Sequence, residues 1–229
     1  MGDYYYASYG LIILGSLIAF LAQAFISIAY KRYKKVYNES KLKGVDVARY
    51  ILDKHGLKNV QVVEVSGELT DHYDPTAKVV RLSSDIYHGD TVAGMAVAAH
   101  ECGHAIQDSV GYIMMRIRAK LVPIVNFSSY AGYIAILLGF LFGLTDVVWI
   151  GIYFELAILL FQLVTLPVEI DASKRALKEL KNYDKVETSE YRGCSVMLVA
   201  AASTYVASVA TTLLQILRLV IIISGKRRD

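Results

Sequence analysis

The sequence has little cysteine and no recognisable nucleic-acid-binding motif. Its two cysteines, Cys102 and Cys194, are too few for a disulfide framework, and no Cys-x-x-Cys pair occurs. We interpret both as small buried thiols. No internal repeat or low-complexity tract is found, and the net charge is only +3. The basic residues cluster beside apolar runs, where membrane orientation explains them better than phosphate binding does.

The composition indicates a membrane protein with one compact aqueous domain. Hydrophobic residues make up 55% of the chain and the mean hydropathy is +0.42, which is high for a soluble globular protein. Charged residues still make up 20%, so a substantial part of the chain must face water. At 229 residues, the chain has room for one or two domains.

The first apolar run predicts a permanent membrane anchor. Residues 10–30 carry no charge and are long enough for one spanning helix. A cleavable signal peptide would need basic residues before the run, and only Asp3 stands there. Tyrosines precede the run and four basic residues follow it between positions 31 and 35. We therefore expect the N-terminus outside and residue 31 onward in the cytosol.

Two further apolar runs predict a transmembrane hairpin, at residues 121–144 and 147–166. Basic residues flank its outer ends, whereas the short turn at Thr145-Asp146 has none, so the turn should lie outside. Glu155 lies inside the second run, where an ionisable side chain is costly. We expect it to have a structural or pathway role, with a partner that the sequence does not name.

The last apolar stretch, residues 194–224, leaves two topologies open. It is long for one span and short for a hairpin. One span would place Lys226, Arg227 and Arg228 outside, against the charge rule. The alternative is a first half packed on the catalytic domain, followed by a tilted second half.

The region between the anchor and the hairpin should be a small α+β domain. Apolar spacing predicts helices at 40–58 and 91–108, and alternation predicts strands at 60–65 and 78–83. The fold class is thus mainly α integral membrane protein, with transmembrane helices plus a small α+β domain. The expected parts are an anchor (1–33), a catalytic region (34–120), a hairpin (121–168), a helix with a metal ligand (169–193), and one or two apolar helices (194–229).

The strongest chemical signal is the run His100-Glu101-Cys102-Gly103-His104. Residues four apart lie on one face of a helix, so both imidazoles can reach one zinc ion. Glu101 can then act as a general base toward a water and as the proton donor to a leaving amine. Cys102 points away from the histidine face, so we exclude it as a ligand.

A catalytic zinc needs a third protein ligand, and the sequence offers several. No His-Glu-x-x-His-x-x-Gly-x-x-His pattern occurs, because Val110 and an apolar region follow the motif. Glu169 is the best placed, just past Pro167, where a helix should begin on the cytosolic side. The remaining candidates are His55, His72, His88, Glu155 and Asp171.

Three segments together resemble the YugP-type membrane zinc metallopeptidases, a neutral zinc metallopeptidase family similar to the membrane-bound gluzincins. They are AVAAHECGHAIQ, LTDHYDPTAKVVRLS and LPVEIDASKRAL, and the resemblance covers roughly residues 10 to 220. It implies that the small α+β domain is a zincin-like catalytic domain. It also implies a plasma-membrane protease with a cytosol-facing site, in which His100, His104 and Glu169 bind Zn2+ and Glu101 is catalytic. In gluzincins the ligand glutamate opens Glu-x-x-Ala-Asp. Here Ser173 stands at the aspartate position, and Asp171 is the candidate for its orienting role.

Two weaker hypotheses concern the stabilisation of developing oxyanion charge. His72, with Tyr73, could line the cleft from the turn before strand 78–83, and Tyr205 could do so from the last apolar stretch. Strand 78–83 could also pair with an extended substrate backbone.

The leading hypothesis is a zinc-dependent endopeptidase at the cytosolic face of the plasma membrane. Its partners would be a peptide or protein substrate, including membrane proteins, and the lipid bilayer. Cobalt or manganese could replace zinc in vitro. One alternative is a zinc-binding scaffold or chaperone without turnover. Another is a site-two-type intramembrane protease, although its Leu-Asp-Gly segment is missing here.

Overall fold

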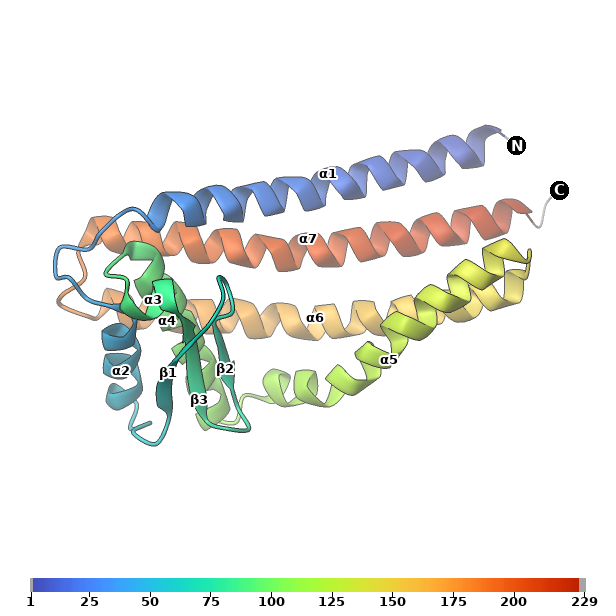
Figure 1. Cartoon of the computed structure of the whole chain (residues 1–229). Coiled ribbons are helices and arrows are strands. Elements are labelled where there is room, and N and C mark those ends of the chain that lie inside the picture. The colour runs from blue at the N-terminus through green and yellow to red at the C-terminus, as the bar shows by residue number, and fades with distance from the viewer. Residues whose placement is uncertain (1, 227–229) are drawn as a thin grey trace. The chain divides into compact units, whose positions relative to one another are not determined.

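The computed structural model describes residues 2–226 and divides the chain into two compact units (Figure 1). Unit 1 comprises residues 1–23, 116–166 and 204–229, and unit 2 comprises residues 24–115 and 167–203. Three long helices contribute residues to both units: α1 (Gly2–Tyr33), α6 (Thr145–Lys181) and α7 (Thr188–Lys226).

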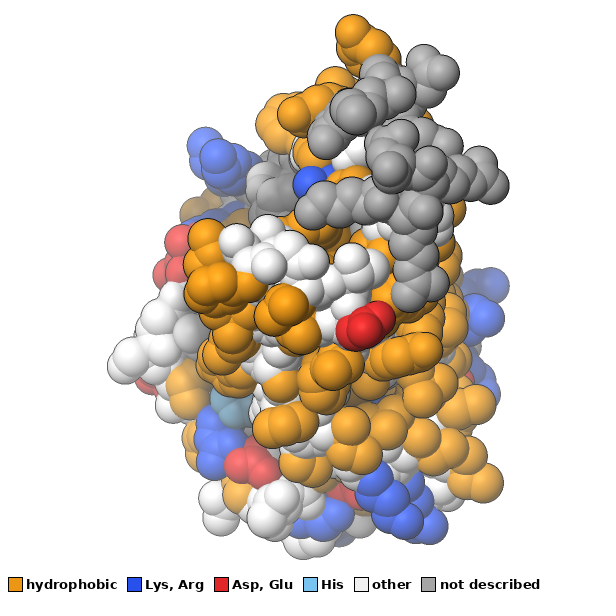
Figure 2. Space-filling view, turned by 90° about the vertical axis from the view of Figure 1, so that its right-hand side faces the viewer, with side chains coloured by type: hydrophobic (Ala, Val, Ile, Leu, Met, Phe, Trp, Pro, Cys, Tyr) orange, Lys and Arg blue, Asp and Glu red, His pale blue; other side chains and the backbone are white. Residues whose placement is uncertain are grey.

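Four helices in the described part of the chain are long and apolar enough to cross a membrane. They are α1, α5 (Ile113–Leu141), α6 and α7. Hydrophobic side chains predominate on the face shown in Figure 2, and large apolar residues such as Phe20, Tyr130 and Leu141 are exposed. Lipid can cover such residues at no cost. The predicted fold class, a mainly helical membrane protein with a small α+β part, is confirmed.

Two helices are continuous where the sequence predicted a helix start or left two topologies open. The helix predicted to begin after Pro167 is instead part of α6, which runs through Pro167 to Lys181. A proline removes one backbone hydrogen bond, yet its fixed φ suits a helix, and membrane helices often contain one. The last apolar stretch forms one helix, α7, rather than two.

In unit 1, glycines bring α5 and α6 close together. A Cβ atom on Gly139 would lie 2.4 Å from Cγ2 of Val148, and one on Gly151 would lie 2.4 Å from Cγ1 of Ile136. Small residues allow such close packing in membranes, where helix association depends on van der Waals contact. The chain turns at Gly143, whose φ of +68° favours glycine. The hairpin interface is thus built from glycine contacts.

Unit 2 contains a three-stranded sheet in the order β1-β3-β2. Strand β1 (Gln61–Val65) runs parallel to β3 (Val79–Ser83), and β2 (His72–Asp74) pairs antiparallel with β3 on its other side. The strands predicted at 60–65 and 78–83 are present, and β2 is an addition. Because β3 is central and paired on both sides, the hypothesis that it pairs with a substrate strand is wrong.

Helix α4 (Val92–Ser109) forms the centre of unit 2 and packs against α2 (Gly44–Lys54) and α3 (Ser84–His88). Fourteen of its eighteen residues are buried, in the second half of the helix as well as in the apolar first half. Thr91 caps its N-terminus by accepting a hydrogen bond from the Gly94 amide at 3.1 Å. The helix with the His-Glu-x-x-His run is therefore a fixed core element.

Candidate metal centre

The two histidines of the motif lie one turn apart on the same face of α4. Their ring centroids are 4.8 Å apart and the rings are nearly perpendicular. His104 is buried and His100 is half-buried. The spacing of four residues thus produces the juxtaposition that the sequence predicted.

Glu169 of α6 reaches both histidines within unit 2. Its Oε2 atom lies 3.3 Å from Nε2 of His100 and 3.5 Å from Nε2 of His104. The ligand atoms of the three residues all lie within 4.8 Å of one another. Among the described residues, no other group of three His, Cys, Asp or Glu side chains is arranged in this way.

A glycine inside the motif allows this convergence. A Cβ atom on Gly103 would lie 2.5 Å from the carbonyl oxygen of Ala172, which is closer than real Cβ contacts come. The backbones of α4 and of the part of α6 that follows Pro167 therefore touch at this point. On α4 the contact residue, Gly103, lies between the two histidines. On α6 the contact residue, Ala172, lies three positions after Glu169.

Gln107 connects His104 to α6 and is completely buried. Its Nε2 donates to the Val168 carbonyl at 2.8 Å and to Oδ2 of Asp171 at 2.9 Å. The amide orientation is thus fixed, and Oε1 lies 3.0 Å from Nδ1 of His104. Since Oε1 can only accept, Nδ1 carries a hydrogen, and in the neutral ring Nε2 is then the nitrogen left to bind a metal ion.

Ser173 has the corresponding position beside His100. Its Oγ atom lies 3.2 Å from Nδ1 of His100. A hydroxyl can accept from Nδ1–H as an aspartate would, so the serine at the gluzincin aspartate position still contacts a histidine. Asp171, the residue suggested for this role, instead bonds Gln107 and, at 2.6 Å, Nε of Arg175.

The electrostatic environment of the site favours positive charge. Burial by itself would lower the pKa of His104. The Glu169 hydrogen bond and the charges of Glu101 and Glu169 outweigh burial, and the pKa is raised. Glu101 is only 8% exposed, and its carboxylate makes no hydrogen bond to a residue that the structure describes. The same field that favours a proton here favours a metal cation.

Two imidazole nitrogens and one carboxylate oxygen fit a catalytic zinc ion, which takes three protein ligands and keeps one position open. Donors about 2 Å from a tetrahedral ion are separated from each other by about 3.3 Å. The two donor distances to Glu169, 3.3 and 3.5 Å, agree with this spacing. The donor set and its spacing therefore suit zinc.

The other histidines that were considered as ligands are bound elsewhere. His55 pairs with Glu179 at 3.1 Å and His88 with Glu64 at 3.1 Å. His72 lies exposed in β2, with Nδ1 2.7 Å from the Thr70 carbonyl. Its suggested catalytic role stays a prediction.

The remaining suggestions concern Tyr73, Tyr205 and Cys102. Tyr73 is buried and donates to Asp108 at 2.7 Å. Tyr205 belongs to unit 1, so its suggested role also stays a prediction. Cys102 is fully buried with Sγ 3.6 Å from the Ala48 carbonyl, and burial raises the pKa of its thiol. It faces α2, in agreement with its exclusion as a ligand.

Membrane-spanning helices together with this site define a membrane-bound zinc peptidase. The chain belongs to the family described as "Putative neutral zinc metallopeptidase", whose model matches residues 8–224. It is also 40% identical to "Putative membrane protease YugP" of Bacillus subtilis (strain 168) over 212 residues. The aligned region covers 93% of this chain and 94% of that protein. No solved structure matches.

Proposed function

We propose that the chain is a zinc endopeptidase that hydrolyses peptide bonds at the cytosolic face of the plasma membrane. In this proposal His100, His104 and Glu169 hold the ion, and Glu101 is the general base. The observation that carries it is the convergence of the three donors within 4.8 Å, beside a buried glutamate on the same helix. Membership of a zinc peptidase family supports the same reaction class.

The ion, when bound, supplies a Lewis acid for the scissile carbonyl and the attacking water. Glu101 takes the proton from that water and later gives it to the leaving amine. Its low exposure keeps bulk water away from the carboxylate. Gln107 and Ser173 hold the two imidazoles with Nδ1 protonated, so that each Nε2 stays available as a ligand.

The charge pattern supports a cytosolic orientation of unit 2. Lys31 and Arg32 stand in the last turn of α1, and Lys178 and Lys181 stand in the last turn of α6. Positive residues near span ends favour the cytosol. With four spans, the start of α1 and the end of α7 would lie on the same outer side, so Lys226 at the end of α7 would be an exception to the rule.

The position of α4 argues against a site-two-type protease, which carries its motif in a span. Helix α4 is not among the four candidate spans. The presence of Glu101 beside the histidines argues against a scaffold without turnover. Substrates would be peptides or proteins at the membrane surface, including membrane proteins.

The test is to purify the protein in detergent and measure bound metal and casein cleavage on the same samples. We expect close to one zinc per chain in the wild type. His104→Ala and Glu169→Ala should lose the zinc, whereas Glu101→Gln should keep it and lose cleavage. Chelation should abolish cleavage, and added zinc should restore it.

Other outcomes would redirect or end the proposal. Zinc retained in Glu169→Ala would move the third ligand to another residue, with Asp171 the first to test. Full cleavage by Glu101→Gln would refute the general-base role. A wild type without zinc would favour the scaffold alternative.

A further inference from the structure

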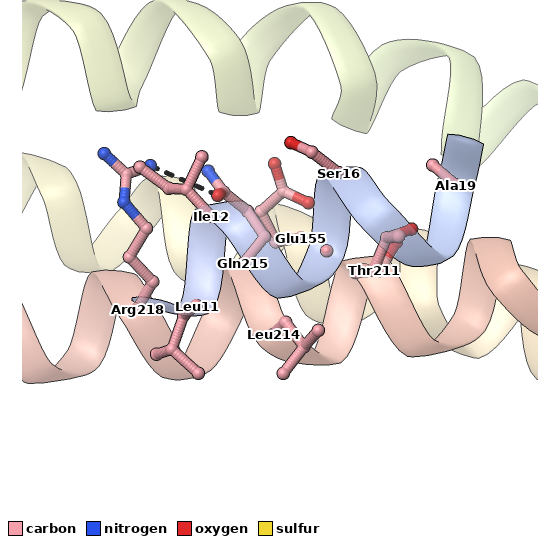
Figure 3. A pocket seen from close by; sticks show the side chains of 11 residues that line it. Leu11, Ile12, Ser16, Ala19, Glu155, Thr211, Leu214, Gln215 and Arg218 are labelled. Carbon is pink, nitrogen blue, oxygen red and sulfur yellow. Dashed lines mark hydrogen bonds between the residues drawn. The ribbon is translucent and has the colours of Figure 1, made fainter. Parts of the chain in front are cut away.

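A cavity of about 440 Å³ lies in unit 1 between α1, α6 and α7 (Figure 3). Ten of its eleven lining residues belong to α1 and α7, and Glu155 alone comes from α6. The lining is more polar than a lipid-facing surface, since it includes Ser16, Glu155, Thr211, Thr212, Gln215 and Arg218. In a membrane such groups face partners or ligands rather than lipid.

Glu155 has no protein partner in this cavity. It is half-buried, and its carboxylate makes no hydrogen bond or ion pair with a residue that the structure describes. Arg218 lines the same cavity but makes no ion pair with Glu155, and its guanidinium bonds Ser8 at 3.2 Å and Gln215 at 3.3 Å instead. The dashed line in Figure 3 marks the second of these bonds. Glu155 is therefore an acceptor that a hydrogen-bond donor entering the cavity would meet.

The depth of Glu155 limits what can supply that donor. The residue follows Asp146, at the α5–α6 turn, by nine positions, or about 14 Å of helix. Half the hydrocarbon thickness of a bilayer is about 15 Å. At this depth lipid tails offer only hydrocarbon, whereas a helix of another protein can offer a polar side chain.

The cavity is accessible from the bilayer but too small for a whole helix. Ile12 and Ser16, on the α1 side, are exposed. Elsewhere in the lining α1 and α7 lie close together, since a Cβ added to Gly15 would be in van der Waals contact with Cδ1 of Leu214, at 3.8 Å. The volume suits one long side chain, and the unpaired carboxylate favours a basic one.

We propose that this cavity receives a lysine or arginine side chain carried by a transmembrane helix of the substrate. The inference rests on the proposed function, since it makes the cavity a recognition site for membrane-protein substrates, separate from the cleavage site. The basic side chain pairs with Glu155, and the hydroxyls of Thr211 and Ser16 offer it further acceptors.

The binding test uses full-length protein with Glu101→Gln, reconstituted in liposomes. The probe is a Leu/Ala transmembrane helix with one central lysine and a fluorescent label. A matched probe has leucine at the same position. Energy transfer from the protein should show that the lysine helix binds about tenfold more tightly.

Substitutions in α6 assign the preference to the cavity. Glu155→Leu should abolish it, and Glu155→Gln, which keeps one acceptor and the side-chain shape, should retain a small part. Gln162→Leu is the matched control: it removes a polar α6 side chain that bonds Ser208 at 2.9 Å outside the cavity, and it should preserve the preference. Gel filtration checks that each variant is folded.

The outcomes separate this inference from the proposed function. Equal binding of the two helices, or a preference that survives Glu155→Leu, would overturn the inference even if casein is cleaved. A lipid that co-purifies with the wild type and is lost with Glu155→Leu would overturn it in favour of a lipid site. Selective binding without casein cleavage by the zinc-loaded wild type would instead refute the proposed function and leave a binding site.

Discussion

At the scale of single residues, the candidate site depends on side chains that do not bind metal. Gln107 is fully buried and makes contacts to His104, Val168 and Asp171. Ser173 supports the other histidine. Both residues act on the direction of an imidazole, so their effects should appear first in zinc affinity.

We predict that Gln107→Leu weakens zinc binding by about 10- to 100-fold, because His104 loses the acceptor that fixes its tautomer. Competition with a chelator measures the dissociation constant. Ser109→Ala is a control on the same helix, since its hydroxyl bonds only the Ile106 carbonyl at 2.8 Å. Unchanged zinc affinity in folded Gln107→Leu would contradict the positioning role.

Gly103→Ala should destabilise the protein by about 1–3 kcal/mol and reduce zinc content, because the added methyl overlaps the Ala172 carbonyl. Gly10→Ala is the matched control, since a Cβ there would have nothing within 4 Å. Thermal unfolding in detergent, followed by zinc analysis, compares the two. Equal unfolding temperatures would show that α4 and α6 can separate without cost.

The residues of the site differ in how far the sequence could predict them. The proximity of His100 and His104 follows from helix geometry alone, and the structure places the two rings side by side, whereas the role of Glu101 stays a prediction. Glu169 needed the position of a span end and a family resemblance. Gln107 was missed, although it follows His104 by three residues on one helix face. Its role depends on the approach of α6, which spacing within α4 does not contain.

At the scale of helices and strands, the sequence predicted the elements that have a long and regular apolar pattern. It did not predict the elements whose pattern is short or interrupted. The alternating runs at 60–65 and 78–83 became β1 and β3. Strand β2 has only three residues and ends at Asp74-Pro75, a turn signal, so no alternation could reveal it. The segment is a strand because it pairs with β3, and this pairing depends on the tertiary structure rather than on the local sequence.

Gly151→Leu should disrupt the α5–α6 hairpin, because even a Cβ atom would lie 2.4 Å from Ile136. We expect a lower midpoint of thermal aggregation and a lower yield in detergent. Gly10→Leu tests whether bulk alone causes the effect, since that position is open. If the two variants aggregate at the same temperature, glycine packing does not hold the hairpin.

At the scale of the whole molecule, the prediction concerns topology. Cys102 and Cys194 are both fully buried, so an introduced cysteine can be labelled on its own. A membrane-impermeant maleimide applied to intact cells should label Leu144→Cys in the α5–α6 turn and should not label Lys58→Cys in unit 2. Permeabilised cells, in which both should react, are the control. The reverse pattern would place the site outside.

The order of the ligands along the chain has a consequence for biosynthesis. Both histidines and Glu101 precede the hairpin formed by α5 and the first part of α6, whereas Glu169 follows it. A nascent chain that has not yet threaded this hairpin into the bilayer lacks one of the three proposed ligands. Under the proposed function, the metal centre would therefore be incomplete until the hairpin has been synthesised, and cleavage would begin only after that.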